Sequence, residues 1–578
     1  MSFLPTSLKE LKALNWDYLD VILFTGDAYI DHPSFGAAVI GRVLEAEGYR
    51  VAIVPQPNWR DDLRDFKKLG TPRLFFGVTS GGMDSMVNHY TANKRLRSND
   101  AYTPEGKSGF RPDYAVTIYT KILKQLFPET PVVIGGIEAS LRRLTHYDYW
   151  SDALKPSILQ ESKADILVYG MGEQPIREIA RRIKNKKTLF DIPQTAIITN
   201  GEITHSNAIL LPSFDECKSN KATFAKHFKH IEEEANKKNA AILIEPISSA
   251  DNNISSAIVV YPPFPTMTEK EIDASFDLPY TRLPHPRYKG KHIPAYEMIK
   301  HSVNIHRGCF GGCSFCTIAA HQGRFIASRS ETSILNEIEK ITKLPDFKGY
   351  LTDVGGPSAN MYGMQGKNEN RCEKCVRYSC IFPTVCNNLN DSHSRLLKLY
   401  KTIRERKEIK KAFVGSGIRY DLFLNENGFF DKTAADYFKT LLRYHVSGRL
   451  KVAPEHTETH VLQTMRKPSF VLFEKLKEFF DRQNEQENLQ LQLIPYFISS
   501  HPNCSETDMQ RLSKKLQYHY MQPEQVQDFT PTPMTHASAI FYSGIDSTTM
   551  KKVYVVRKKE EKLRQKEWFF QKNIKNRK

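Results

Sequence analysis

The sequence lacks a long apolar run and has few cysteines outside one short region. None of its 578 residues lies in an uncharged apolar segment of about 18 residues, the length that suggests a membrane-spanning helix. The first six residues also lack the basic region and apolar region of a secretion signal. Seven of the nine cysteines lie between residues 309 and 386, which does not suit disulfides distributed over a secreted fold. We therefore expect a cytoplasmic protein that does not bind a membrane.

The overall composition is that of a globular protein with enough apolar residues for a substantial core. Hydrophobic residues make up 40% of the chain and charged residues 25%. A chain of this length corresponds to about three or four domain-sized parts. The composition thus favours an enzyme with several domains.

The chain before residue 200 alternates short apolar runs with amphipathic stretches. The predicted strands are residues 19–25, 50–55, 73–79, 132–136 and 164–169, and the predicted helices are residues 35–47, 114–127 and 173–184. This alternation indicates an α/β fold, with a doubly wound parallel sheet in residues 1–200. Glycines follow several of these strands, at the edge of such a sheet where ligands bind. Alternatively, these glycines only form tight turns between strands and helices.

The rest of the chain divides into three further parts. Residues 201–295 are polar and rich in proline, which favours a connector or a small subdomain. Strand-helix alternation resumes in residues 296–535 and predicts a partial or complete β/α barrel with a cysteine-rich insertion at 357–390. Its predicted strands are residues 301–306, 350–356, 412–419, 450–456, 491–499 and 525–529. Residues 536–578 form a basic C-terminal extension.

Three cysteines with C-x3-C-x2-C spacing follow the first predicted strand of this barrel. Thiolates are preferred ligands of iron-sulfur clusters, and Cys309, Cys313 and Cys316 would bind three irons of a four-iron cluster and leave one iron open. The glycines at 308, 311 and 312 allow a short loop to direct three thiolates to one centre. The alternative is a structural zinc site with a fourth ligand from His306 or His321.

This loop, with an aromatic residue before its last cysteine, resembles the signature of the radical S-adenosylmethionine (radical SAM) superfamily. The resemblance implies a [4Fe-4S] cluster on which S-adenosylmethionine is cleaved reductively to a 5′-deoxyadenosyl radical, with a one-electron reductant such as flavodoxin or ferredoxin as partner. Phe315 would lie beside the adenine. Gly355 and Gly356 match the glycines that contact the methionine moiety in these enzymes, although Pro357 replaces the usual glutamate.

Two polar residues after the third predicted barrel strand are further candidates for binding the cofactor. Ser416 and Arg419 would contact its ribose and carboxylate, because an arginine fork pairs well with a carboxylate. The alternative is an arginine that forms a salt bridge at the end of a strand. Other polar residues at predicted strand ends are candidates for lining a substrate cavity: Asp353, Glu455, His456, His501 and Tyr542.

A second group of cysteines lies in the predicted insertion. Four thiols within fifteen residues indicate a metal site: Cys372, Cys375, Cys380 and Cys386. Four thiolates can bind either a structural zinc ion or an auxiliary iron-sulfur cluster, and the spacing does not distinguish these two possibilities.

Several stretches resemble the YgiQ family of bacterial radical SAM proteins over nearly the whole chain. They are residues 25–36, 353–362, 452–456, 465–468 and 526–534. The N-terminal domain is also similar to the cobalamin-binding domain that precedes many radical SAM barrels. In that domain an Asp-x-His-x-x-Gly pattern supplies a histidine ligand to cobalt. Here Asp31 and His32 are adjacent and Gly36 follows four residues later. The resemblance therefore leaves cobalamin binding open and makes ligation by His32 doubtful.

Charge is concentrated at the C-terminal end. Residues 551–578 contain twelve lysines or arginines against three glutamates, interleaved with Trp568, Phe569 and Phe570, and the whole chain has a formal net charge of +17. Such a segment suits binding to nucleic acid, but it also suits a solvated, partly disordered helix. Two alternatives to the radical SAM enzyme of unknown substrate therefore stay open: a radical SAM enzyme that modifies RNA, and a non-catalytic protein that binds zinc and nucleic acid.

Overall fold

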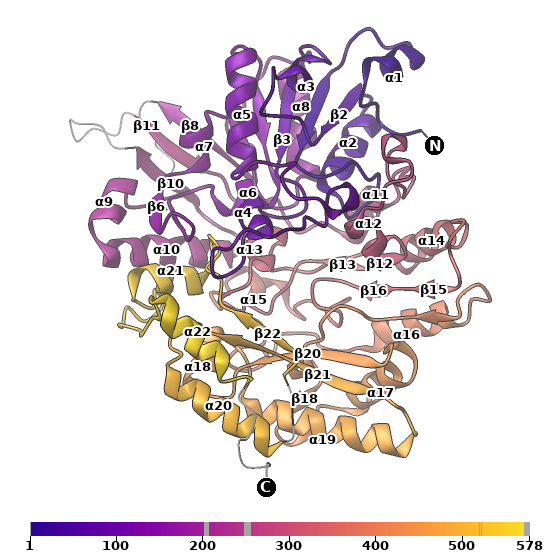
Figure 1. Cartoon of the computed structure of the whole chain (residues 1–578), viewed down its shortest axis with the longest axis vertical. Coiled ribbons are helices and arrows are strands. Elements are labelled where there is room, and N and C mark those ends of the chain that lie inside the picture. Colours follow the sequence, from indigo (N-terminus) through magenta and orange to yellow (C-terminus); the bar gives the residue numbers. More distant parts are fainter. Residues whose placement is uncertain (1, 201–206, 248–255, 520, 522, 571–578) are drawn as a thin grey trace. The chain divides into compact units, whose positions relative to one another are not determined.

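The computed structural model (Figure 1) describes residues 2–570 except 201–206, 248–255, 520 and 522. The chain divides into two units, each described below by itself. Unit 1 contains Met1–Lys300, Ala320–Gly323 and Thr532–Met534. Unit 2 contains His301–Ala319, Arg324–Pro531 and Thr535–Lys578.

Unit 1 is built on one sheet with the strand order β2-β1-β3-β4-β7-β8-β11-β10-β9. Its strands are β1 (Val21–Thr25), β2 (Val51–Pro55), β3 (Phe75–Thr79), β4 (Val132–Ile134), β7 (Ile166–Val168), β8 (Thr195–Asn200), β9 (Ala208–Leu210), β10 (Ile242–Ile247) and β11 (Ser256–Val260). Neighbouring strands from β2 to β7 are parallel, whereas β8 pairs with both β7 and β11 in antiparallel fashion. The predicted parallel sheet is therefore present, and it has an extension with antiparallel strands.

Helices lie between these strands along the chain. In unit 1 they are α1 (Leu8–Ala13), α2 (Gly36–Ala46), α3 (Arg64–Lys67), α4 (Ser85–His89), α5 (Ala115–Leu126), α6 (Gly136–Leu141), α7 (Ile158–Ser162), α8 (Glu173–Lys184), α9 (Phe214–Ser219), α10 (Lys221–Ala235), α11 (Glu269–Phe276) and α12 (Pro294–Ile299). A hairpin, β5 (His146–Asp148) and β6 (Ala153–Lys155), follows α6. Short 3-10 turns cover Pro104–Gly106 and Pro286–Tyr288.

Alternate residues of the parallel strands belong to two different cores. Val21 and Leu23 pack with α2 and α8 in one apolar cluster, whereas Ile22 and Phe24 pack with α5 and α7 in another. Successive side chains of a strand point to opposite faces of a sheet, so a strand that is buried on both sides is apolar throughout. The continuous apolar runs in the sequence therefore encode a sheet with helices on both faces, as predicted.

Residues 201–295 differ from the predicted connector. The described part of this range contains β9, β10 and β11, which belong to the same sheet as β1. The charged stretch within this range forms two helices, α9 and α10. Asn220 lies between them, and its side-chain oxygen accepts hydrogen bonds from the N–H groups of Ala222 and Thr223. A capping residue of this kind begins a new helix, which explains the division.

Unit 2 contains short parallel ladders, as expected for a partial barrel. Its strands are β12 (Ser302–Asn304), β13 (His306–Arg307), β14 (Ala327–Ser328), β15 (Tyr350–Leu351), β16 (Asp353–Gly355), β17 (Lys411–Ala412), β18 (Leu424–Asn425), β19 (Gly428–Phe429), β20 (Arg449–Glu455), β21 (Gln492–Ser499) and β22 (Gln525–Asp528). The parallel pairs are β12 with β16, β15 with β17, β20 with β21, and β21 with β22. These strands carry the cysteine loop and the polar strand ends that the sequence singled out.

The helices of unit 2 lie between its strands and after the last of them. They are α14 (Glu331–Thr342), α15 (Glu369–Glu373), α16 (Ser394–Arg404), α17 (Lys432–Thr440), α18 (Thr459–Met465), α19 (Phe470–Gln486), α20 (Glu506–Tyr518), α21 (His536–Ser543) and α22 (Lys559–Glu567), with a 3-10 turn at Tyr420–Leu422 and a π-helical turn at Leu441–His445. α13 (Ile318–Gln322) crosses the boundary between the units. The region predicted as an extension, 536–578, thus contributes α21 and α22 to unit 2.

Candidate functional site

The first cysteine loop follows β13 in unit 2. Cys309, Cys313 and Cys316 are partly exposed free thiols, and the N–H of Cys316 donates to the carbonyl of Cys313 at 3.2 Å. Gly308 and Gly312 have φ angles of 87° and 64°, a conformation that glycine adopts at low cost. Burial, together with the neighbouring thiols of Cys313 and Cys309, raises the pKa of Cys316 to about 12. The structure therefore brings the three predicted ligands together in one glycine-rich turn.

Two glycines of this loop are closely approached by other segments of unit 2. A Cβ atom at Gly312 would lie 2.5 Å from the carbonyl oxygen of Tyr378, and one at Gly311 would lie 2.6 Å from Nη1 of Arg419. Both distances are shorter than a carbon atom can tolerate, so a larger residue would displace Tyr378 or Arg419. The loop thus depends on glycine for its close contacts as well as for its backbone conformation.

Arg419 lies beside the cysteines. Its Nη1 donates to Sγ of Cys313 at 3.3 Å, whereas Nε and Nη2 donate to the two carboxylate oxygens of Asp421 at 2.9 and 2.6 Å. Burial disfavours the charge, but Asp421 and the neighbouring sulfurs outweigh this effect and raise the pKa of Arg419 well above its usual value. Arg419 is therefore a fixed cation: its Nε and Nη2 pair with Asp421, and its Nη1 is directed to a thiol. A contact of Arg419 with a cofactor carboxylate, as predicted, would have to use the other edge of the guanidinium, formed by Nη1 and Nη2.

Ser416 is likewise engaged within the protein. Its hydroxyl donates to Oδ2 of Asp353, and the N–H of Gly415 donates to Oδ1 of Asp353 at 2.9 Å. Gly355 allows this approach, because a Cβ atom there would lie 3.0 Å from Oγ of Ser416. A Cβ atom at Gly356 would lie within 2.4 Å of the ring of His306. The three predicted cofactor residues Gly355, Gly356 and Ser416 are thus close to one another or to the strand that precedes the cysteine loop.

The predicted substrate-cavity residues fall into different environments. His456 and His501 are fully buried, and burial lowers the pKa of each to about 3, so both are neutral. Tyr542 lies within α21 and not at the end of a strand. Glu455 ends β20 with a φ of 68°, which is uncommon outside glycine, and burial raises the pKa of its carboxyl group. Of these candidates, Glu455 has the strained, buried environment that often marks a functional position.

The second cysteine loop is joined directly to the first. The N–H of Cys380 donates to the carbonyl of Phe310 at 3.2 Å, and the hydroxyl of Ser379 donates to the carbonyl of Gly311 at 2.8 Å. Phe310 belongs to an apolar cluster with Ile381 and Leu389, on which Cys309, Cys380 and Cys386 also pack. The two groups of cysteines, separated in the sequence, are therefore neighbours in unit 2.

Two sulfurs of the second loop accept hydrogen bonds. Nδ2 of Asn388 donates to Sγ of Cys372 at 3.2 Å, and Nη2 of Arg324 lies 3.7 Å from Sγ of Cys380. Such N–H groups typically surround thiolates that bind a metal. The partners Asn388 and Arg324 could not be recognised from the sequence, because no spacing rule connects them to the cysteines.

The thiols of the described residues do not form a site for a single metal ion. Within residues 2–570, leaving out the four gaps named above, no group of three or more His, Cys, Asp or Glu side chains could hold one metal ion. A four-iron cluster is wider than an ion, and its ligands lie correspondingly farther apart. The alternative of a zinc site at the first loop is also not supported by its predicted fourth ligands: the ring of His306 packs on Gly356, and Nδ1 of His321 lies 3.1 Å from Oγ of Ser140 in unit 1.

The strand ends of unit 1 are filled by ion pairs. Arg111 lies 3.0 Å from Asp27 and 3.1 Å from Asp100, and all three side chains are buried. The N–H of Gly82 donates to Asp27 at 2.6 Å, and a Cβ atom at Gly81 would lie 2.1 Å from that carboxylate. Here Gly81 and Gly82 form a tight turn around a buried carboxylate. This agrees with the alternative that the glycines after the strands only form tight turns.

His32 is buried near the end of β1. Its Nδ1 accepts a hydrogen bond from the N–H of Ser34 at 3.1 Å, and burial with nearby Arg282 lowers its pKa well below the usual value. The neighbouring Asp31 forms a buried pair with Arg42, in which the shorter contact is 2.5 Å. Asp31, the acidic residue of the pattern, therefore forms an ion pair with Arg42.

The basic C-terminal segment is folded over its described part, which ends at residue 570. The ring of Phe569 packs against Phe497 with centroids 6.0 Å apart, and Lys566 lies 3.2 Å from Asp528. Phe569 is thus part of the protein interior and cannot stack on a base without unfolding of this contact. α22 packs on unit 2 through Lys562 and Gln565, and its other residues are at least partly exposed; residues 571–578 lie outside the described part of the chain.

The cysteine loop and the α/β fold define the class of the protein. Residues 3–302 match the Radical SAM N-terminal domain, and residues 524–576 match a domain of unknown function, DUF3362. Many relatives carry the name UPF0313. The chain is 57% identical to the UPF0313 protein of Bacteroides thetaiotaomicron, covering 98% of this chain and 94% of that protein. It is 58% identical to that of Porphyromonas gingivalis, covering 98% and 90%. The chain therefore belongs to the UPF0313 family of radical SAM proteins, which confirms the predicted YgiQ resemblance.

Solved structures of radical SAM enzymes are more distant. The methyltransferase TsrM from Kitasatospora setae, solved with cobalamin and a [4Fe-4S] cluster, is 14% identical with a TM-score of 0.48, covering 89% of this chain and 74% of TsrM. OxsB, solved with aqua-cobalamin, is 10% identical with a TM-score of 0.48, covering 91% and 55%. Ligands of these proteins are not transferred to this chain on such similarity. No helix among the described residues has the length and apolar composition to cross a membrane.

Proposed function

We propose that this protein is a radical SAM enzyme that binds a [4Fe-4S] cluster through Cys309, Cys313 and Cys316. Bound there, a reduced cluster would supply the one electron needed to break the bond between sulfur and C5′ of S-adenosylmethionine, giving methionine and a 5′-deoxyadenosyl radical. The electron would come from a one-electron reductant such as flavodoxin or ferredoxin. The radical would abstract a hydrogen atom from a substrate, and the proposal names no particular substrate.

The observation that carries the proposal is the pairing of three thiols with a fixed cation. The thiols lie in one turn, and Arg419 donates to Cys313 while Asp421 holds its other N–H groups. Thiolates bound to iron carry negative charge, and N–H groups directed at sulfur stabilise that charge and tune the reduction potential. The residues present therefore fit a four-iron cluster.

The chain's own residues would position the cofactor around this turn. We assign Phe315 to the adenine, and the backbone of Gly355 and Gly356 to the methionine moiety. Ser416 would act through Asp353, because its hydroxyl already donates to that carboxylate. We assign Arg419 to the cysteine loop in addition to the cofactor carboxylate, because its Nη1 donates to Sγ of Cys313 while Asp421 holds Nε and Nη2.

For Cys372, Cys375, Cys380 and Cys386 we favour an auxiliary cluster over zinc. The N–H donors at Cys372 and Cys380 support metal-bound thiolates. Among the described residues, no three of these side chains are placed to hold one metal ion, as four-coordinate zinc would require. Cobalamin is not part of the proposal and stays an implication of the N-terminal resemblance, to be tested by cobalt analysis.

Anaerobic reconstitution of the full chain tests the proposal. Iron, sulfide, zinc and cobalt are quantified, and dithionite and S-adenosylmethionine are added while 5′-deoxyadenosine is measured by mass spectrometry. We expect bound iron and sulfide and release of 5′-deoxyadenosine. Zinc without iron would instead support the non-catalytic zinc and nucleic-acid alternative. Comparison of modified nucleosides in RNA from wild-type and deletion strains tests the RNA-modifying alternative.

A further inference from the structure

The C-terminal region that matches the domain of unknown function lies directly behind the first cysteine loop. We propose that this region, taken here as the described residues 526–569 of unit 2 without Thr532–Met534 and called the C-terminal clamp, positions the loop that carries Cys313 and Cys316. The inference rests on the proposed function, because it assigns the clamp a role in holding the cluster ligands. The proposal assigns a structural role to a region whose family match is a domain of unknown function.

The central contact is Ser314, which lies between Cys313 and Cys316 and is buried. Its N–H donates to the carbonyl of Met465 at 3.1 Å, and its carbonyl accepts from the N–H of Ala537 at 2.8 Å. Ala537 belongs to α21, within the clamp. Both backbone polar groups of Ser314 are therefore satisfied by other segments of unit 2, and one of these bonds comes from the clamp.

The hydroxyl of Ser314 is fixed by His501. Nδ1 of His501 lies 2.8 Å from the carbonyl of Pro502, so this nitrogen must carry the proton and donate. Nε2 of the neutral ring is then an acceptor, and it receives the hydroxyl of Ser314 at 3.3 Å. His501 thus fixes both the position of Ser314 and the direction of its hydroxyl.

The ring of His501 is held between two aromatic side chains. Phe315, in the cysteine loop, lies edge-on at a centroid distance of 5.9 Å. Phe529, in the clamp, lies at 5.1 Å on an inclined plane. A movement of Phe529 would therefore be transmitted through His501 to Phe315, the residue assigned to the adenine.

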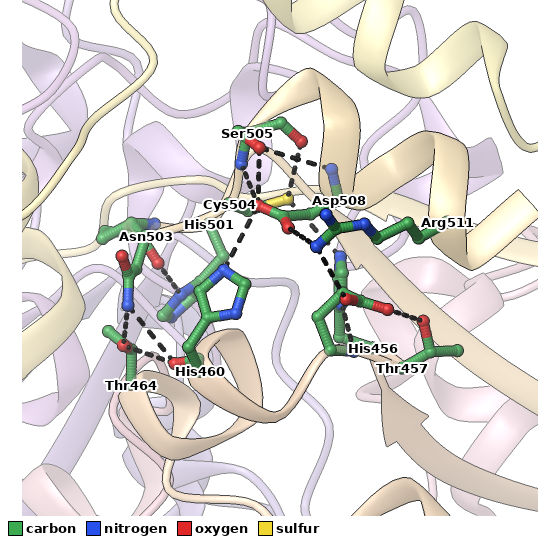
Figure 2. Close-up of polar contacts among 12 residues, drawn as sticks. His456, Thr457, His460, Thr464, His501, Asn503, Cys504, Ser505, Asp508 and Arg511 are labelled. Atoms are coloured by element: carbon green, nitrogen blue, oxygen red, sulfur yellow. Dashed lines mark hydrogen bonds and ion pairs between the residues drawn. The ribbon is translucent and has the colours of Figure 1, made fainter.

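The turn that presents His501 is strained and needs support. Ser500 and Asn503 have φ angles of 61° and 70°, which non-glycine residues adopt only at a cost. The clamp supplies two of the supporting bonds: the N–H of Ser500 donates to Oε1 of Gln565 at 2.9 Å, and the N–H of Asn503 donates to the carbonyl of Tyr554 at 2.8 Å. Nδ2 of Asn503 also donates to Oγ1 of Thr464 at 3.0 Å (Figure 2).

Gln565 forms a further link through Cys504. Its Nε2 donates to the carbonyl of Cys504 at 2.9 Å, and Sγ of Cys504 lies 3.5 Å from its Oε1. The same sulfur lies 3.4 Å from Nε2 of His456, which Figure 2 shows beside the turn. Because Gln565 is fully buried, loss of these partners would leave polar groups without hydrogen bonds. The turn that contains His501 is therefore hydrogen-bonded to Gln565 of α22 on both sides of His501.

Two substitutions separate this role from a general effect on folding. Gln565→Leu removes the bonds from α22 to the turn, and Ser314→Ala removes only the hydroxyl that His501 accepts. Glu560→Gln, at an exposed position of the same helix, is the matched control. All variants are reconstituted anaerobically as full chains, and their folding is compared by thermal unfolding.

The readouts are the rate at which a chelator removes iron and the EPR spectrum of the reduced protein. We expect Ser314→Ala and Gln565→Leu to lose iron roughly two- to tenfold faster than the wild type, the factor expected for one hydrogen bond, with an altered EPR spectrum. Glu560→Gln should match the wild type. If Gln565→Leu does not fold, the rate of iron loss and the EPR spectrum of Ser314→Ala test the inference.

Wild-type rates and spectra in Ser314→Ala, or in a folded Gln565→Leu, would overturn the inference. Failure of the wild-type protein itself to bind iron would overturn the proposed function, so the two failures are distinguishable.

Discussion

Polar residues and glycines follow parallel strands in both units, but they form different kinds of structure. In unit 1, Arg111 lies between the buried carboxylates of Asp27 and Asp100. In unit 2, Arg419 pairs with Asp421 and donates from Nη1 to the thiol of Cys313. The carboxylates in unit 1 are already paired with an arginine, whereas thiols beside a fixed cation can still bind a metal. A strand end therefore offers a ligand site only where its side chains retain unused ligand capacity.

Removal of the first three thiols should have the largest effect. Cys309→Ala, Cys313→Ala and Cys316→Ala in one chain should abolish 5′-deoxyadenosine release and remove the iron of one cluster, because no other residue of this loop supplies a soft ligand. Iron analysis and mass spectrometry measure both effects. Cys217→Ala, at a buried cysteine of unit 1, is the control and should retain both. Full activity in the triple variant would disprove the assignment.

Removal of the second group of thiols tests whether unit 2 has one metal centre or two. Replacement of Cys372, Cys375, Cys380 and Cys386 by alanine should lower the iron content per chain and leave the zinc content unchanged. The EPR signal of the first cluster should persist, with a change in shape because the two loops are in contact. An unchanged iron content would show that the second loop carries no cluster.

The buried arginine of unit 1 should matter for stability and not for iron binding. Arg111→Met leaves Asp27 and Asp100 buried without their cation, a change that typically costs about 3–5 kcal/mol. We expect a clear decrease in the thermal unfolding midpoint and an unchanged iron content. Arg64→Met, whose pair with Asp62 is exposed, should leave the midpoint unaltered. A loss of iron in a folded Arg111→Met variant would weaken the contrast between the units.

The smallest expected effect is a pH dependence from Asp27. Burial raises the pKa of this carboxyl group to about 6, despite the opposing effects of Arg111 and of the Gly82 N–H. The folded protein therefore retains a proton that the unfolded chain has already lost, and Asp27 costs stability as the pH rises from about 4 to about 6. The stability of Asp27→Asn relative to the wild type should increase by about 3 kcal/mol over this range. Urea unfolding at several pH values measures it, and a pH-independent difference would contradict the raised pKa.

Local patterns predicted much of the fold. The helix expected at 173–184 is α8, Glu173–Lys184, and the continuous apolar runs of unit 1 became strands buried on both faces. The strand expected at 412–419 is much shorter, β17 at Lys411–Ala412. Asp353 explains the difference, because it accepts hydrogen bonds from the N–H groups of Gly415 and Ser416 and so withdraws them from a ladder. A bond between residues about sixty positions apart has no local signal.

The sequence indicated the cysteine loop of the candidate site but not the residues around it. The spacing of the cysteines and the glycines between them indicated the loop. The commitment of Arg419 to Asp421 depends on the turn at Tyr420–Leu422, and Asn388 and Arg324 reach the second loop through tertiary folding. The burial of Gln565 and Phe569 in the C-terminal segment could not be predicted for the same reason, since the charge and aromatic residues of that segment describe only its composition.

The most direct test of the account is the EPR spectrum of the anaerobically reconstituted, dithionite-reduced protein with and without S-adenosylmethionine, combined with measurement of 5′-deoxyadenosine. The account predicts a [4Fe-4S] signal that changes when S-adenosylmethionine is added, followed by release of 5′-deoxyadenosine. Both should be absent when Cys309, Cys313 and Cys316 are replaced by alanine. A fully reconstituted wild-type protein that is colourless, or whose cluster neither responds to S-adenosylmethionine nor cleaves it, would contradict the central claim.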